Sequence, residues 1–169
     1  MSIIQRLSSI VNISLAIVAL ALPASAAPPS YQARVVSIAD GDTITVLDAD
    51  NRQVKIRLYG IDCPEKRQPY GTRARQATAD AVMGKTVNVH PIDTDRYGRT
   101  VALVAVPGRE MLNGWLVKEG LAWVYPQFCR RADICDRLRE LERAAKEGKK
   151  GLWQDKEPVE PWVWRKGKR

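Results

Sequence analysis

Three short segments of the sequence contain residue types that could bind a cation and an anion. Residues 40–43 read DGDT, residues 57–65 read RLYGIDCPE, and residues 95–99 read DRYGR. Asp42 and Asp62 lie at the ends of neighbouring predicted strands. They could share one hard cation, with waters and a backbone carbonyl completing the roughly six to eight oxygens that Ca²⁺ takes. Two close carboxylates repel each other, so a bound divalent ion would keep both ionised.

Each segment also has a plainer interpretation. Asp and Gly are frequent in hairpin turns, so residues 40–43 alone predict only a turn. Arg57 and Asp62 alone predict a surface ion pair. Asp95 fits a solvated loop. The single histidine, His90, fits a structural position at the end of a strand better than a catalytic one.

The elements that would position these residues are short strands and a few helices. β-branched residues with partial alternation predict strands over residues 32–38, 43–47, 53–58, 86–90 and 100–106. Apolar residues at helical spacing predict helices over residues 71–84, 110–119 and 133–148. Thr72 and Asp133 are the expected caps at the starts of the first and last helix. The pattern is five strands with one helix inserted after the third.

The composition indicates one basic domain preceded by an export signal. The 169 residues carry a formal net charge of +8. Residues 11–22 are an apolar run, and residues 24–26 read ASA, which predicts a secretory signal peptide over residues 1–26 that is cleaved after Ala26. The run is shorter than the roughly 20 residues that span a bilayer, which disfavours the alternative of an uncleaved anchor. The domain left behind stays basic, which fits a polyanionic partner.

The three cysteines are compatible with one local disulfide. Cys129 and Cys135 lie six residues apart near the start of a predicted helix, and export permits a bridge between them. Cys63 would then be a free thiol, although a bridge from Cys63 to Cys129 stays open as an alternative. One histidine and no CxxC motif argue against a zinc site.

At these motifs the chain resembles the thermonuclease, or staphylococcal nuclease-like, family. The three segments occur in the family's order, followed by LVKEGLA at 116–122, GLW at 151–153 and PWVWR at 161–165. The resemblance covers about residues 34–153. It implies an α+β fold, a five-stranded OB-fold β-barrel with three α-helices. The expected organisation is a nuclease domain over residues 27–153 and a basic tail over residues 154–169 that contains Trp162 and Trp164.

The resemblance also implies roles for single residues. Asp42, Asp62 and the backbone carbonyl of Cys63 match the Ca²⁺ ligands of the family, and Glu65 matches the carboxylate that acts as general base or orients the attacking water. Arg57 and Arg99 match the pair that binds the scissile phosphate. A guanidinium suits this role because its planar fork can bind two phosphate oxygens at once. The implied reaction is Ca²⁺-dependent hydrolysis of DNA or RNA that leaves 3′-phosphate ends.

Contacts to the nucleotide transfer less directly. The family's best-known member has two tyrosines where this chain has Pro126 and Phe128. Phe128 could still stack on a base, Tyr125 could replace a lost tyrosine, and Tyr97 could line the substrate groove. Aromatic platforms in a shallow groove favour single-stranded substrate.

We expect a secreted or periplasmic monomer that has no stable membrane association after signal cleavage.

Two other functions are alternatives to the nuclease that the resemblance implies. The main alternative is a nucleic-acid-binding OB-fold module that has lost catalysis. A third interpretation is an exported structural protein that uses the barrel for protein contacts. An inactive domain should have lost at least one of the five matched side chains, and all five are present: Asp42, Arg57, Asp62, Glu65 and Arg99.

Overall fold

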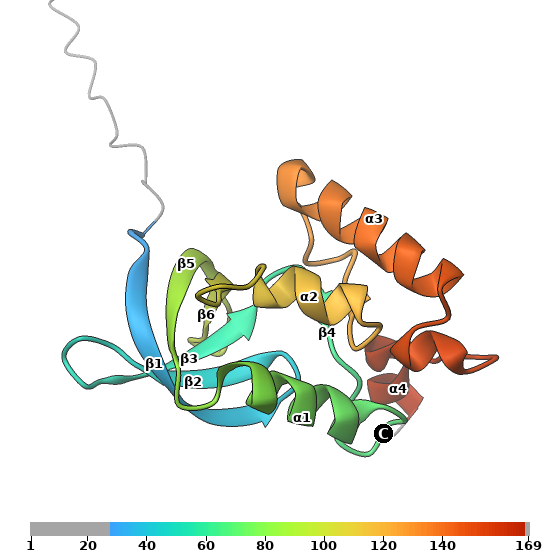
Figure 1. The fold of residues 1–169 in the computed structure, drawn as a ribbon, viewed down its shortest axis with the longest axis horizontal. Helices are drawn as coiled ribbons and strands as arrows, with labels where there is room; N and C mark the ends of the chain where they lie inside the picture. Colours follow the sequence, from blue (N-terminus) through green and yellow to red (C-terminus); the bar gives the residue numbers. More distant parts are fainter. Residues whose placement is uncertain (1–27, 168–169) are drawn as a thin grey trace, which may run out of the picture.

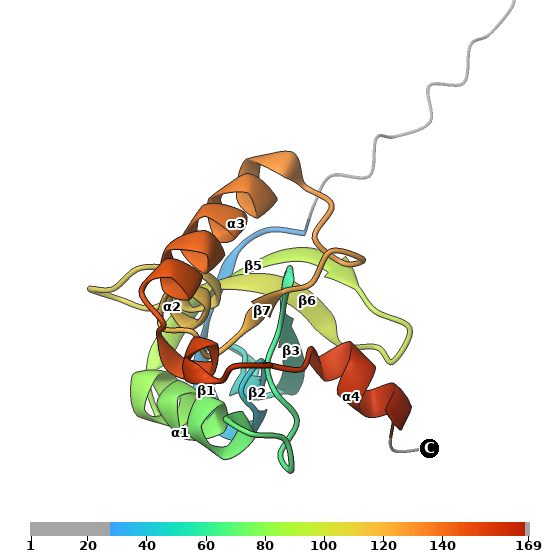
Figure 2. The same ribbon diagram turned by 90° about the vertical axis from the view of Figure 1, so that its right-hand side faces the viewer.

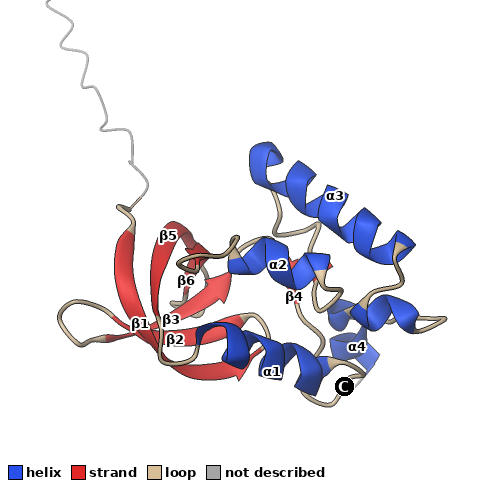
Figure 3. Cartoon of the chain, in the orientation of Figure 1, coloured by secondary structure: helices blue, strands red, loops and turns tan. Residues whose placement is uncertain are grey.

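The computed structural model describes residues 28–167. Strands lie at one end of the molecule and most of the helices at the other (Figure 3). The predicted signal peptide over residues 1–26 lies outside the described residues. Within the described part, no helix is long and apolar enough to cross a membrane.

Five strands close into a barrel, as the sequence predicts. They are β1 (Tyr31–Asp40), β2 (Thr43–Leu47), β3 (Gln53–Leu58), β5 (Thr86–Thr94) and β6 (Thr100–Ala105). The order around the barrel is β1-β2-β3-β6-β5, with β5 hydrogen-bonded back to β1. All neighbours are antiparallel except β3 and β6, which run parallel. Buried Val, Ile and Leu side chains of these strands fill the interior, because alternate residues of a barrel strand face inward.

The helices outnumber the three that we predicted. They are α1 (Gly71–Val82), α2 (Leu112–Lys118), α3 (Ala132–Glu147) and α4 (Pro161–Gly167), with a short 3₁₀ helix, η1 (Gly151–Gln154). Figure 1 shows α1 and α2 beside the barrel, α3 packed on the far side of α2, and α4 near the end of the chain. We missed α4 because its seven residues span two turns, too short for a helical apolar pattern to be recognised.

Both predicted helix caps are wrong. Tyr70, in the left-handed conformation, precedes α1, and Arg131 precedes α3; neither cap forms a side-chain hydrogen bond. Asp133 instead lies in the first turn of α3, where it pairs with Arg131 at 2.6 Å. Residue type alone predicted the caps wrongly, because in each case the backbone enters the helix two residues earlier.

Strand β5 continues beyond the predicted end at His90. Pro91 follows, and a proline cannot donate a ladder hydrogen bond. The structure instead places Pro91 opposite Ala102, next to an irregularity in the pairing of β5 with β6. Bulges of this kind are among the few places where a strand tolerates proline.

A second, very small sheet lies between the barrel and the helices. It consists of β4 (Ile61–Asp62) and β7 (Trp123–Val124), which pair so that Asp62 lies opposite Trp123. Figure 2 shows β7, one of its two strands, between α2 on one side and α4 on the other. Two residues carry no periodic signal, so the sequence did not predict it. This sheet matters for the site because its pairing holds Asp62 next to β7, the strand that precedes the C-terminal part of the chain containing Arg165.

Candidate active site

Asp42 is a buried carboxylate at the tight connection between β1 and β2. Its side chain is 5% exposed. Asp42 Oδ2 accepts the backbone N–H of Cys63 at 2.6 Å, and Oδ1 lies 3.3 Å from the Thr43 hydroxyl. The amide of Cys63 therefore links the first and second sequence segments directly.

Gly41, beside it, is required by space rather than by turn geometry. A Cβ at this position would lie 2.8 Å from Cys63 Sγ and 2.9 Å from the Cβ of Ala74 in α1. Gly41 has no positive φ. The DGDT segment is thus a turn whose glycine lets α1 and the 57–65 segment approach the backbone next to Asp42.

Arg57 bridges the two predicted metal-ligand carboxylates. It lies on β3, opposite Thr43 of β2. Its guanidinium forms ion pairs with Asp42 through Nη1 and with Asp62 through Nη2, the latter at 2.7 Å. The three side chains are 15%, 5% and 2% exposed. The expected pair of Arg57 with Asp62 exists, but it is buried and shares a third member, so it is not a surface ion pair.

Glu65 lies on the loop that follows β4 and is held by backbone contacts. Its N–H donates to Gln68 Oε1 at 3.0 Å, and its carbonyl accepts the N–H of Gln68 at 2.8 Å. A Cβ at Gly71 would collide with the Glu65 carbonyl, so glycine is needed where the loop enters α1. The Glu65 side chain is 41% exposed, which leaves it accessible to water while its backbone is fixed.

Arg165 of α4 completes this cluster, a role that we did not predict. Its Nη2 donates to Asp62 Oδ2 at 2.6 Å, and its Nη1 donates to Glu65 Oε1 at 2.7 Å. Partial burial works against the charge of Arg165. The hydrogen bonds to Asp62 and Glu65 outweigh this effect and hold its pKa above the ordinary arginine value. We had interpreted Arg165 only as part of a basic tail.

Arg99, the second predicted phosphate ligand, lies just before β6. Residue 101, two positions on, pairs with Arg57 across the parallel β3–β6 contact. The Arg99 side chain pairs with Asp95 at 2.7 Å. Burial alone would raise the pKa of Asp95, but hydrogen bonds from the backbone of Arg99 and from its guanidinium lower it. Asp95 therefore fixes Arg99, and with a side chain that is 19% exposed it is not the solvated loop residue that we expected.

The predicted nucleotide-contacting aromatics fall into two groups. Tyr97 is 68% exposed, with the guanidinium of Arg96 4.8 Å from its ring centroid. Phe128 is 53% exposed and packs edge-on against Tyr125, with ring centroids 4.8 Å apart. Tyr125 also stacks on Trp162 of α4, nearly parallel, at 4.7 Å. One face of the Tyr125 ring is therefore covered by Trp162 of the tail.

The cysteines pair as the local alternative predicted. Cys129 and Cys135 form a disulfide, and Cys63 is a free, buried thiol. Burial raises the pKa of Cys63 well above the usual thiol value. The thiol is therefore a core group, and only backbone atoms of residue 63 are suited to the cluster.

The donor set fits a hard cation that is completed by water. Asp42, in the turn between β1 and β2, and Asp62, on β4 of the small sheet, contribute buried carboxylate oxygens, the ligand type that Ca²⁺ prefers, although they do not lie on neighbouring strands as the sequence predicted. Among residues 28–167, no group of three or more His, Cys, Asp or Glu side chains is arranged as a ready-made metal site. A cation here would need backbone carbonyl and water oxygens in addition to the two carboxylates.

Comparison with known proteins identifies the family. The family described as "Staphylococcal nuclease homologue" matches residues 55–155. The chain belongs to the staphylococcal nuclease family. The matched region contains Arg57, Asp62, Glu65 and Arg99, whereas Asp42 and Arg165 lie outside it.

Several bacterial relatives are similar over most of their length. An "Uncharacterized endonuclease" of Escherichia coli O157:H7 is 43% identical over 132 residues, 78% of this chain and 83% of the relative. "Protein ParB" of Escherichia coli is 44% identical over 161 residues, 90% of this chain and 88% of the relative. A "Micrococcal nuclease" of Shigella flexneri is 39% identical over 144 residues, 80% of this chain and 81% of the relative. Membership of this nuclease family supports a hydrolase that acts on nucleic acids.

Proposed function

We propose that the protein is a Ca²⁺-dependent nuclease that hydrolyses phosphodiester bonds of DNA and RNA and leaves 3′-phosphate ends. One observation carries the proposal. Arg57 is held between two buried carboxylates, Asp42 and Asp62, and the half-exposed carboxylate of Glu65 joins the same cluster through Arg165. Cation ligands, a phosphate ligand and a candidate base thus lie within one network of ion pairs.

The proposed cation site consists of Asp42, Asp62 and the backbone carbonyl of Cys63, with waters. Ca²⁺ fits because all of these donors are oxygens and because extracellular fluids supply calcium in quantity. A bound cation would polarise the phosphate and lower the pKa of a bound water. Such a cation would also reduce the repulsion between the two carboxylates.

The chain's own residues would bind the phosphate and move the proton. A bound cation would compete with Arg57 for Asp42 and Asp62. The guanidinium of Arg57, once released from these carboxylates, could bind two phosphate oxygens of the substrate at once. Arg99 would be the second phosphate ligand, which requires it to leave Asp95 or to share it. Glu65 is exposed enough to accept a proton from the attacking water or to orient that water.

The surface around the site favours single-stranded substrate. The exposed rings of Tyr97 and Phe128 can stack on unpaired bases, which requires no particular sequence. The positive net charge attracts a polyanion from any direction. We further propose that the protein acts as a monomer in the periplasm or outside the cell. The disulfide between Cys129 and Cys135 supports an oxidising compartment.

The test measures degradation of single-stranded DNA by the purified protein, with Ca²⁺ or with a chelator, beside Glu65→Gln. We expect cleavage that requires Ca²⁺ and falls about 10²–10⁴-fold in the variant, the usual contribution of a general base. Glu147→Gln, an exposed charge-matched change at the end of α3, should cleave as the unmodified protein does. Tight binding without cleavage under any divalent ion would instead favour the inactive binding module.

A further inference from the structure

The C-terminal helix α4 contributes to the cluster rather than merely packing beside it. Arg165 lies 100 residues after Glu65 and 103 residues after Asp62, yet its guanidinium hydrogen-bonds both side chains. The Asp62 side chain is 2% exposed and the Arg165 side chain 41% exposed. The guanidinium therefore enters the cluster from the solvent side, the side from which a substrate would arrive.

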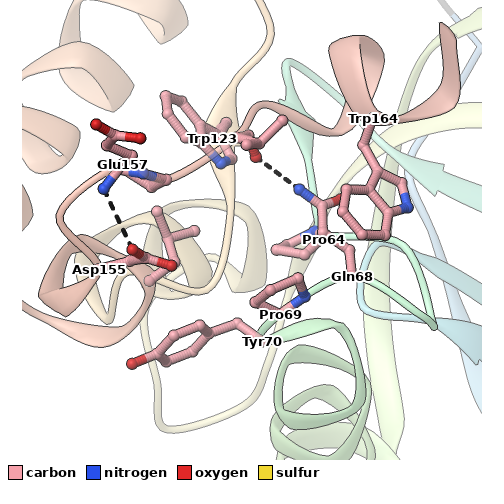
Figure 4. Close-up of a pocket in the computed structure, with 11 residues that line it drawn as sticks. Pro64, Gln68, Pro69, Tyr70, Trp123, Asp155, Glu157 and Trp164 are labelled. Carbon is pink, nitrogen blue, oxygen red and sulfur yellow. Dashed lines mark hydrogen bonds between the residues drawn. The ribbon is translucent and has the colours of Figure 1, made fainter. Parts of the chain in front are cut away.

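A buried amide side chain, that of Gln68, also links the tail to the loop that carries Glu65. Gln68 Oε1 accepts the N–H of Glu65, and Gln68 Nε2 donates to the carbonyl of Val159 at 2.6 Å. Figure 4 shows this second bond, with Trp164 lining the same pocket as Pro64 and Gln68. Two residues after Val159, Pro161 is buried at the start of α4. The tail and the loop of Glu65 are thus one packed unit.

The other face of α4 is anchored by aromatic contacts. Trp162 stacks on Tyr125, with ring planes 7° apart, and lies edge-on to Trp123 at 6.0 Å. Trp123 is the residue that pairs with Asp62 in the small sheet. These contacts hold the backbone of α4 while leaving the long side chain of Arg165 free to change partners, because an arginine side chain has several rotatable bonds.

The charges of the cluster indicate which group Arg165 would bind after it leaves Asp62. Three carboxylates, Asp42, Asp62 and Glu65, face two guanidiniums, Arg57 and Arg165, so one net negative charge remains. A divalent cation would change this to one net positive charge, which matches the single negative charge of a phosphodiester. The same cation would take oxygens of Asp62 that Arg165 now occupies, and the released guanidinium would lie beside the site.

We propose that Arg165 is an active-site residue that exchanges partners. It neutralises Asp62 and Glu65 while they lack a cation, and it binds a phosphate of the nucleic acid once a divalent cation binds Asp62. This inference rests on the proposed nuclease function. It makes α4 the source of a phosphate ligand in addition to Arg57 and Arg99.

The first test is Ca²⁺ titration by calorimetry without nucleic acid, for the unmodified protein and for Arg165→Gln. Removal of a competing guanidinium should tighten Ca²⁺ binding about tenfold, the lower end of what hydrogen bonds between charged groups contribute. Lys166→Gln is the matched control, because it removes the same charge one residue later on α4, where the side chain is exposed. It should change the affinity less than twofold.

The second test measures kcat and KM on single-stranded DNA at saturating Ca²⁺. Arg165→Gln should lower kcat/KM by about 10–100-fold, as expected when a charge-assisted phosphate contact is lost. Arg165→Lys should fall in between, since it keeps the charge but loses the fork. A third variant, Trp162→Ala, keeps the Arg165 side chain but removes the stacking on Tyr125 that anchors α4. Because α4 would then hold Arg165 less firmly against Asp62, Ca²⁺ affinity should shift in the same direction as in Arg165→Gln.

Two results would overturn the proposal. Equal Ca²⁺ affinity of Arg165→Gln and the unmodified protein, or no Ca²⁺ binding by either, would show that Arg165 does not compete with a cation. Equal or higher kcat/KM of Arg165→Gln at saturating Ca²⁺ would show that Arg165 only obstructs the site. Failure of the nuclease function itself would be distinguishable, because the unmodified protein would then cleave no DNA while the calorimetry still reported on Arg165.

Discussion

Arg57 lies between two carboxylates, those of Asp42 and Asp62. Asp42 and Asp62 are both buried, and in a protein interior such charges are costly unless they are paired. Arg57 pairs with both carboxylates in the described structure, and Arg165 pairs with Asp62 as well. The same guanidinium is the proposed phosphate ligand, so one side chain stabilises the metal-free fold and serves the chemistry.

The variant Arg57→Gln separates these two roles. Without Ca²⁺ it should lower the free energy of unfolding by about 3 kcal/mol, because the buried carboxylate of Asp42 loses its ion-pair partner while Asp62 keeps Arg165. Adding Ca²⁺ should then stabilise the variant more than the unmodified protein, because the cation would replace the missing positive charge. Urea unfolding with and without Ca²⁺ measures both effects.

Lys55→Gln, an exposed change on the same strand, is the control for the Arg57 variant. It should leave stability within about 0.5 kcal/mol of the unmodified protein. If Arg57→Gln gained no more from Ca²⁺ than the control does, the cation would not bind at Asp42 and Asp62.

At the scale of the elements, the second sheet and the loop before α3 hold the site against the barrel. Tyr59 follows β3, and its hydroxyl accepts the backbone N–H groups of Arg130 and Arg131, each at 2.9 Å. The disulfide between Cys129 and Cys135 closes the same loop. Tyr59 thus connects the end of β3 to the start of α3 across the small sheet that carries Asp62.

Tyr59→Phe tests this connection. The substitution keeps the ring, which is 6% exposed, but leaves two N–H groups without their acceptor. We expect a loss of about 1–3 kcal/mol, the usual cost of unsatisfied buried hydrogen-bonding groups. The measurement is chemical unfolding at equilibrium, with Tyr31→Phe on β1 as the matched removal of a hydroxyl. Equal stability of the two variants would mean that water replaces Tyr59 at no cost.

The sequence predicts elements well where many residues repeat a pattern. The five barrel strands follow from runs of β-branched residues, and Cys129 with Cys135 follows from their spacing. It predicts poorly what depends on a few residues in contact: the two-residue strands, the true helix starts, and the proline inside β5. In each case tertiary contacts decided the backbone, and a local pattern cannot report them.

The same distinction applies to the site. Arg57 and Asp62 lie five residues apart, on either side of the end of β3, and their pairing could be predicted from that short separation. Arg165 could not, because no periodicity or motif spacing links it to Asp62 over 103 residues. The signal that could have found it was the PWVWR ending: tryptophans that bury a tail also fix the position of the arginine that follows them.

At the scale of the whole molecule, three distant parts of the chain converge on one face of the barrel. Asp42 comes from the first connection, the 57–65 segment from the third strand and its extension, and Arg165 from the last helix (Figure 2). The chain around them is basic overall. A long anionic polymer would therefore meet favourable charge beyond the few contacts of the site.

Salt should then weaken substrate binding in a predictable way. If about three phosphates are neutralised, the affinity for single strands should fall about twentyfold between roughly 50 and 200 mM KCl, because bound counterions are released from the nucleic acid. KM measured at fixed Ca²⁺ should rise accordingly, while kcat at saturating substrate stays within about twofold. Arg99→Gln should lower the slope of log KM against log salt by about 0.7, the share of one phosphate contact. An unchanged slope would mean that Arg99 stays with Asp95 and contacts no phosphate when substrate binds.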